Sequence, residues 1–195
     1  MSRYSAKELR TIRSNRKYQV GKITGFTKEQ IMVLALNWGT ENNKQRVIGG
    51  LNANGADVDV VKIEKVFGEV LTNKDWDFIE DTWKLINSYW QERNDVQERL
   101  YGVPLGKEEA ISFTINGREI SGGYYPIVYD GSLSVKASEQ DVNEIVKQQL
   151  SSNAVFGVGM GSTKKRATKV DRMLLLSFDV IPKAVTEAVP HVSIS

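Results

Sequence analysis

The sequence predicts a mainly α-helical, multi-helix domain with one β-hairpin arm packed on a long helix that carries tryptophans. Three observations predict this class. Thr or Ser is followed three residues later by Gln or Asp at several places, which is typical of helix starts. Apolar residues recur every three or four positions between about 73 and 100. Asn116-Gly117 lies between two alternating runs, which is the strongest short-range signal for a hairpin.

Length and composition are those of an ordinary globular protein. The chain has 195 residues, of which 41% are hydrophobic and 26% charged. This length fits one domain, or one domain with a small lobe. Its apolar runs fall far short of the ~20 residues that a bilayer crossing needs. The N-terminus has no apolar core of a signal peptide, so we expect no membrane span and no secretion by that route.

Reactive side chains are scarce. Cysteine is absent and His191 is the one histidine, which excludes disulfides and thiolate zinc sites and disfavours serine–histidine catalysis. Three carboxylate pairs lack a histidine or a third carboxylate at ligand spacing, so we interpret them as loop or solvated surface. They are Asp57/Asp59, Asp75/Asp77 and Glu80/Asp81. We therefore expect no catalytic residue, no metal and no cofactor.

Positive charge is concentrated at the N-terminus. Residues 1–24 hold seven basic side chains and one acidic one, a formal net charge of +6, whereas the net charge is −4 over 25–100 and zero over 101–195. We predict a basic N-terminal arm over 1–26. Its charges are either an ordinary solvated surface or a contact for nucleic acid or an acidic partner. The candidate nucleic-acid contacts in this arm are Arg10, Arg13, Arg16 and Lys17.

Three helices are predicted between 27 and 70. Thr27 with Gln30 forms a capping box for a helix that is apolar on most sides and that we expect Gly39 to end. Thr40 begins a second, short helix, and 57–70 forms a third. The stretch 37–47 is rich in amides, and we expect Asn43 or Arg46 to be buried and paired; a polar contact surface is the alternative.

The next helix, from about 73 to about 100, starts at a Thr72/Asp75 capping box. Its apolar stripe is widened by further aromatic and aliphatic residues. Tryptophans at this spacing belong to the hydrophobic core far more often than to a surface that stacks on a ligand. The stripe consists of Trp76, Ile79, Trp83, Ile86 and Trp90. Gly102-Val103-Pro104 ends the helix, because proline cannot continue the hydrogen-bond ladder.

The hairpin spans 110–130. Gly122-Gly123 lets the backbone bend, and Pro126 keeps the preceding residue extended. We expect this return segment to lie across the tryptophan helix. We also expect Tyr124 and Tyr125 to be half-buried, with their hydroxyl groups satisfied at the rim.

The last third of the chain contains a predicted helix over 138–151 and a flexible, glycine-rich basic loop over 151–169. "GVGMGS" (157–162) lacks the Gly-Lys-Ser/Thr of a phosphate-binding loop, so we interpret it as a loop. The adjacent basic residues are further candidate phosphate contacts, namely Lys164, Lys165, Arg166 and Lys169. An apolar run over 173–176 and a last helix that includes Pro182 follow. We assign 27–195 to a single helical domain.

Three stretches in this order carry a family resemblance: "LALNWGTENNKQRVIGG", then "LTNKDWDFIEDTWKLINSYW" with "ERLYGVP", then "GREISGGYYPIVYD". Together they resemble a module of very large tailed-phage proteins, the internal virion or ejection proteins and the large polyvalent proteins. The resemblance covers about 27–130 and implies a phage origin and a noncatalytic module. Relatives continue past the equivalent of the C-terminal "AVPHVSIS", so a stand-alone version and a piece of a longer protein both stay open.

These observations favour a noncatalytic structural or interaction module of a phage virion or ejected protein, with DNA contact through the basic segments. The expected partners are virion proteins or other parts of a larger phage protein, and the expected location is the virion or the host cytoplasm. One alternative is a stand-alone nucleic-acid-binding protein without sequence preference. The other, an enzyme, is disfavoured by the scattered carboxylates and the single histidine.

Overall fold

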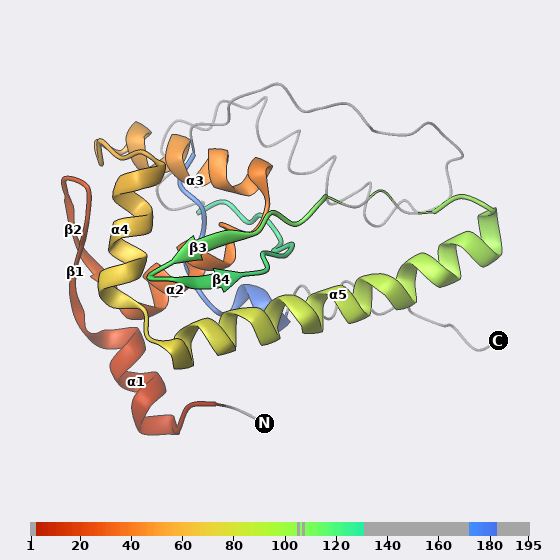
Figure 1. Ribbon diagram of the computed structural model, residues 1–195, viewed down its shortest axis with the longest axis horizontal. Helices are drawn as coiled ribbons and strands as arrows, with labels where there is room; N and C mark the ends of the chain where they lie inside the picture. The colour runs from red at the N-terminus through yellow and green to blue at the C-terminus, as the bar shows by residue number, and fades with distance from the viewer. Residues whose placement is uncertain (1–2, 105, 107, 131–171, 183–195) are drawn as a thin grey trace.

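The computed structural model describes residues 3–104, 106, 108–130 and 172–182 (Figure 1). Its helices are α1 (Ala6–Ser14), α2 (Lys28–Leu36), α3 (Glu41–Ala53), α4 (Val60–Val70) and α5 (Asn73–Tyr101). Its strands are β1 (Arg16–Val20), β2 (Ile23–Thr27), β3 (Phe113–Ile115) and β4 (Arg118–Ile120). The predicted mainly α class is confirmed. The predicted helix 138–151 and basic loop 151–169 lie outside the described residues.

Helix α2 lies at the centre of the described core. It packs against α1, α4, α5 and β2, and seven of its nine residues are buried. A helix that is apolar on nearly all sides is stable in water only when neighbours cover it in this way. The Thr27/Gln30 capping box is present as predicted. The predicted end was wrong: α2 stops at Leu36, with Asn37 as its C-cap.

Two further predicted helix starts agree with the structure. The Thr40 side chain accepts from the backbone N–H of Asn43 at the start of α3, and the Thr72/Asp75 capping box starts α5. The third helix begins a little later than its predicted bounds, because the Asp59 side chain accepts from the backbone N–H of Lys62 and so makes Asp59 the N-cap of α4.

The first half of α5 supplies two of the three buried tryptophans among the described residues, and Trp38 is the third. Trp76 and Trp83 are buried, and the rings of Phe67 and Phe113 pack edge-on against Trp76, with centroids 6.0 and 5.9 Å away. Trp90 is only half-buried. Past this point α5 projects beyond the other described elements (Figure 1). Four of the five residues of the predicted stripe are therefore core, and Trp90 lies at its edge.

The β3–β4 hairpin turns where the sequence predicts. Asn116 and Gly117 have φ values of 50° and 78°, and Phe113 pairs with Ile120. Both residues tolerate the positive φ that a tight hairpin turn needs. Arg118 of β4 donates to Asp77 and to Glu80 of α5, each at 2.7 Å, so the hairpin is bound to the start of the long helix.

The two glycines after β4 allow a very close approach to α5. Gly122 has a φ of 70°, and a Cβ on Gly123 would lie 2.4 Å from Cγ of Trp83. Gly39, the predicted cap of α2, faces this contact, and its carbonyl oxygen accepts from the N–H groups of Ile111 and Gly123. The segment is therefore glycine-rich because side chains would hold it away from the tryptophan ring.

The two tyrosines that follow do not share one environment. Tyr124 is 37% exposed, whereas Tyr125 is 1% exposed and its hydroxyl has no hydrogen-bond partner among the described residues. The expectation of two half-buried tyrosines with satisfied hydroxyl groups was wrong for Tyr125. Its carbonyl oxygen accepts from Asn43 Nδ2 at 2.7 Å, which holds this backbone close to α3 and directs the ring inward. Burial raises the pKa of the Tyr125 hydroxyl above its usual range.

The structure contains a second hairpin where the sequence analysis placed a basic arm. Strands β1 and β2 pair antiparallel, and the turn at Gly21 packs against the backbone of Ala56. Helix α1 precedes them, and this N-terminal segment buries Tyr4, Ile12, Val20 and Phe26. The arm prediction missed these elements because single apolar residues spaced among many charges give little periodic signal.

Residues 172–182, called here the C-terminal strap, cross the described core. Leu174 bridges Tyr129, and burial alternates along the extended strap at Leu174, Leu176, Phe178 and Val180. The backbone of Arg172 passes so close to Gly50 of α3 that a Cβ there would lie 2.3 Å from its carbonyl oxygen. Val180–Pro182 are helical, in agreement with the predicted last helix.

Candidate nucleic-acid interface

The structure describes four of the eight predicted nucleic-acid contacts. Arg10 and Arg13 lie on α1, Arg16 and Lys17 lie on β1, and all four are exposed. The other four lie outside the described residues, namely Lys164, Lys165, Arg166 and Lys169. The described half of the prediction therefore falls on two consecutive elements at the N-terminus.

Among these four, Arg13 has a structural role. Its guanidinium lies 3.5 Å from Glu29 of α2 and 3.3 Å from Asp179 of the strap. Glu29 in turn accepts from the backbone N–H of Phe178 at 2.8 Å. Arg13 therefore links three elements, and its charge is already balanced.

The remaining cations have no carboxylate partner within the described part of the chain. Arg16 donates only to the carbonyl oxygen of Gly25, at 3.4 Å, and the Lys17 ammonium lies 5.3 Å from the ring centroid of Tyr18. Lys7, one turn before Arg10 on α1, belongs to the same group. We call Lys7, Arg10, Arg16 and Lys17 the basic segment.

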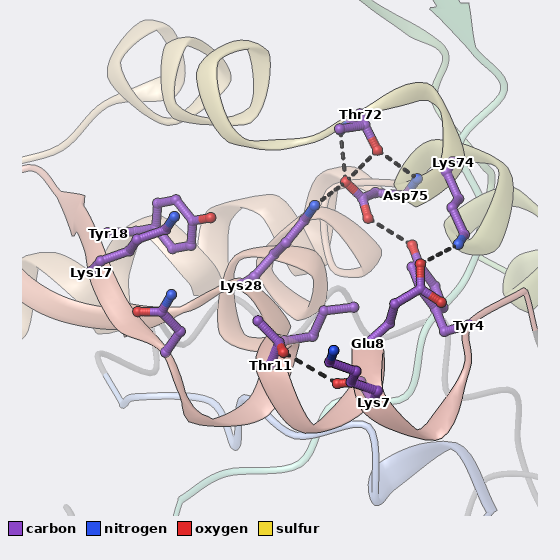
Figure 2. Close-up of a pocket in the computed structure, with 12 residues that line it drawn as sticks. Tyr4, Lys7, Glu8, Thr11, Lys17, Tyr18, Lys28, Thr72, Lys74 and Asp75 are labelled. Atoms are coloured by element: carbon purple, nitrogen blue, oxygen red, sulfur yellow. Dashed lines mark hydrogen bonds and ion pairs between the residues drawn. The ribbon is translucent and has the colours of Figure 1, made fainter.

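A buried carboxylate holds α1 against the rest of the fold. Asp75 is 1% exposed and accepts from the Tyr4 hydroxyl at 2.6 Å, from Lys28 Nζ at 2.7 Å and from Thr72 (Figure 2). Burial alone would raise the pKa of Asp75, but the hydrogen bonds from Lys28, Tyr4 and Thr72 outweigh it and leave the pKa below its usual range. Burial, together with the bond to Asp75, raises the pKa of Tyr4.

The interpretation of the carboxylate pairs as solvated surface was wrong for Asp75. The capping box turns this side chain back toward Thr72 and hence toward the protein interior. Its neighbours on α5 are ion-pair partners that are more exposed than Asp75: Asp77 and Glu80 bind Arg118, and Asp81 binds Arg3.

A second ion pair closes the contact between α1 and α5. Glu8 accepts from Lys74 Nζ at 2.7 Å and from the backbone N–H of Ser5 within the capping box of α1. The bond from Lys74, followed by those from Ser5, lowers the pKa of Glu8 to about 2. Glu8 is therefore ionised at neutral pH, and α1 keeps a fixed position beside the start of α5.

A pocket of about 470 Å³ lies between these elements. In Figure 2, Lys17 and Tyr18 stand on one side, Lys28 reaches across to Asp75, and Glu8 with Lys74 stands on the other side. It is lined by Tyr4, Lys7, Glu8, Thr11, Ile12, Asn15, Lys17, Tyr18, Lys28, Thr72, Lys74 and Asp75. The sequence analysis missed Lys28 and Lys74, because only the fold brings them beside the basic N-terminus.

The amide-rich stretch before and within α3 has a structural role. Asn43 is 1% exposed and donates to Asn37 Oδ1 and to the Tyr125 carbonyl oxygen, and the prediction that it is buried and paired is confirmed. Arg46 is 8% exposed and donates to Asn42 and to the Tyr129 hydroxyl. These bonds fasten α3 to the segment that follows β4.

Comparisons with known proteins identify no relative of this chain: no family model, no curated protein and no solved structure matches it. The resemblance to large phage proteins therefore stays a prediction. In the described part of the chain, no three His, Cys, Asp or Glu side chains come together as a metal site. None of the described helices is long and apolar enough to cross a membrane.

Proposed function

We propose that this protein is a noncatalytic module of a phage virion or ejected protein, and that it contacts nucleic-acid phosphates through the basic segment. The observation that carries the proposal is the placement of Lys7, Arg10, Arg16 and Lys17. They are exposed on two ordered elements, and none has a carboxylate partner among the described residues. The packing of the β3–β4 hairpin on α5 serves, in this proposal, as structural support.

Exposed cations that have no carboxylate partner among the described residues attract a polyanion. Each phosphate that a lysine or arginine neutralises releases counterions from the nucleic acid, so affinity depends on salt and little on sequence. We expect dissociation constants of about 10⁻⁴–10⁻⁶ M at physiological salt, the usual range of nonspecific binders. We expect the protein to act in the virion or in the host cytoplasm.

The test is fluorescence anisotropy with a labelled DNA duplex, titrated with protein at several salt concentrations. The variant combines Arg10→Gln, Arg16→Gln and Lys17→Gln. The matched control combines Lys65→Gln, Lys84→Gln and Arg99→Gln, which removes the same charge from exposed positions outside the pocket. Net charge is thus equal in the two variants, and only its location differs.

We expect the basic-segment variant to bind about tenfold or more weakly at low salt, and its affinity should also depend less on salt, because fewer phosphates are neutralised. The control should stay close to the unmodified protein. Equal losses in both variants would mean that net charge alone drives binding. The absence of binding by the unmodified protein at high micromolar concentration would discard the nucleic-acid role.

A further inference from the structure

The pocket beside α1 has more positive than negative charge. Lys7, Lys17, Lys28 and Lys74 line it, and Glu8 and Asp75 are its two carboxylates (Figure 2). The formal balance is therefore +2. This excess is concentrated in one concavity of about 470 Å³, a size typical of small-molecule sites.

Each of the two carboxylates is paired with a lysine. Asp75 is held by Lys28 at 2.7 Å and by Tyr4 at 2.6 Å, and Glu8 is held by Lys74 at 2.7 Å. A lysine ammonium has three N–H donors, so Lys28 and Lys74 keep donors beyond these bonds. Lys7 and Lys17 make no ion pair in the part of the chain that the structure describes.

The pocket also has an apolar wall. Ile12 is buried and Tyr18 is half-buried, and both line the space between the lysines. A ligand that combines a compact dianion with a flat or apolar body would meet both kinds of surface. A purely apolar ligand would have to cover four ammonium groups, which is costly without compensating partners.

We propose that this pocket binds a phosphate monoester, carried either by a free nucleotide or by the 5′ end of a nucleic-acid strand. A monoester has a second pKa near 6, so it is largely a dianion at neutral pH and matches the +2 balance. An internal phosphodiester carries one charge and continues into the strand on both sides, which suits an exposed surface better than a pocket. The proposal goes beyond the duplex contact described above and does not depend on it.

The first experiment is isothermal titration calorimetry of the full chain, at low salt and neutral pH, with inorganic phosphate, adenosine monophosphate and adenosine. Inorganic phosphate and the monophosphate should bind, and adenosine should bind about tenfold more weakly or not at all, because it lacks the charge-assisted hydrogen bonds. Equal binding of adenosine and its monophosphate would overturn the proposal, and so would absence of binding by every phosphate ligand.

The second experiment uses Lys7→Gln combined with Lys17→Gln. Both side chains are exposed and make no ion pair among the described residues, so the variant should have the same melting temperature as the unmodified protein. It should bind the monophosphate about tenfold more weakly. Lys65→Gln, whose side chain is 74% exposed on α4, is the control and should leave affinity unchanged. Unchanged affinity in a folded double variant would overturn the site.

A third arm separates the two sources of the monoester and separates this proposal from duplex binding. It compares short single strands that carry either a 5′ phosphate or a 5′ hydroxyl group. If the 5′-phosphorylated strand binds more tightly than the 5′-hydroxyl strand, the ligand is a strand end. If the two strands bind equally and only the free monophosphate binds to the pocket, the ligand is a nucleotide. Binding of the monophosphate without binding of an unphosphorylated duplex would support this site and contradict the proposed function. Binding of the duplex without binding of the monophosphate would support the proposed function and contradict this site.

Discussion

Three residues that lie far apart in the sequence meet at the carboxylate of Asp75. Tyr4, Lys28 and Thr72 all bond to it, and Asp75 is 1% exposed. A buried charge is tolerated only when it is paired and fully hydrogen-bonded, and removing one member leaves the others without partners. Asp75 therefore contributes to the position of α1, together with the ion pairs Glu8–Lys74 and Arg13–Glu29.

We predict that Asp75→Asn lowers the free energy of unfolding by about 3 kcal/mol at neutral pH, because Lys28 then lacks its counter-charge. The pKa of Asp75 is lowered in the folded protein, so its stabilising contribution is present above the unfolded pKa of about 3.9 and is lost as the pH falls through the folded pKa. The difference between variant and parent should consequently shrink in acid. Urea unfolding between neutral pH and pH 3 measures both effects.

Asp95→Asn is the control for this prediction. Asp95 lies exposed on the same helix, and its side chain accepts from Gln91 at 2.8 Å. Its replacement should change stability by less than about 0.5 kcal/mol at any pH. A cost for Asp75→Asn that does not change with pH would show that side-chain packing, and not the charge, holds α1 in place.

At the scale of elements, α5 has a buried face and an exposed face. Trp83 is 3% exposed, donates through Nε1 to the carbonyl oxygen of Leu36 at 2.9 Å, and contacts Gly123 closely. Leu85, two residues later, is 44% exposed. One helix therefore offers a core position and a surface position within a single turn.

We predict that Trp83→Ala costs about 3–5 kcal/mol, because it leaves a cavity and also removes the hydrogen bond to the end of α2. Leu85→Ala is the control and should cost less than about 1 kcal/mol. Thermal and urea unfolding of both variants would check this. A melting temperature of Trp83→Ala close to that of the parent would contradict the assignment of Trp83 to the core.

The elements that could be predicted are those with local signals. The capping boxes at Thr27 and Thr72 and the Asn116-Gly117 turn each lie within four consecutive residues, and each agrees with the structure. The β1–β2 hairpin has no such signal, because its turn at Gly21 is stabilised by a distant partner, the backbone of Ala56. The burial of Tyr125 likewise depends on Asn43, eighty-two positions away.

The candidate site could be predicted only in part, for the same reason. The excess of charge near the N-terminus is visible in the sequence and pointed to Lys17. The pocket is completed by Lys28, Lys74 and Asp75, which belong to two other helices and reach it only through the fold. No local pattern shows that Arg13, one of the predicted contacts, is neutralised by Glu29 and Asp179.

At the scale of the whole molecule, the C-terminal strap packs against the N-terminal segment. The strap reaches α1 through Asp179 and Arg13, and it reaches α5 through the rings of Phe178 and Phe78, whose centroids are 5.1 Å apart. The backbone N–H of Phe178 also bonds to Glu29 of α2. The first predicted basic cluster belongs to the N-terminal segment, and the second, which includes Lys164, Lys165, Arg166 and Lys169, precedes the strap in the sequence.

The final prediction concerns the second cluster. Lys164→Ala, Lys165→Ala and Arg166→Ala together should flatten the plot of log affinity for duplex DNA against log salt, by about 0.9 for each phosphate that is no longer neutralised. The melting temperature should stay close to that of the unmodified protein, because single surface charges contribute little to folding. Combined with Arg10→Gln, Arg16→Gln and Lys17→Gln, the effects on slope should add, because each cluster would neutralise phosphates of its own. Anisotropy titrations at four or more salt concentrations, with melting curves for each variant, measure both quantities.

If the slope stays unchanged while the protein stays folded, phosphate binding is confined to the basic segment, and the sequence-based assignment of Lys164, Lys165, Arg166 and Lys169 is wrong.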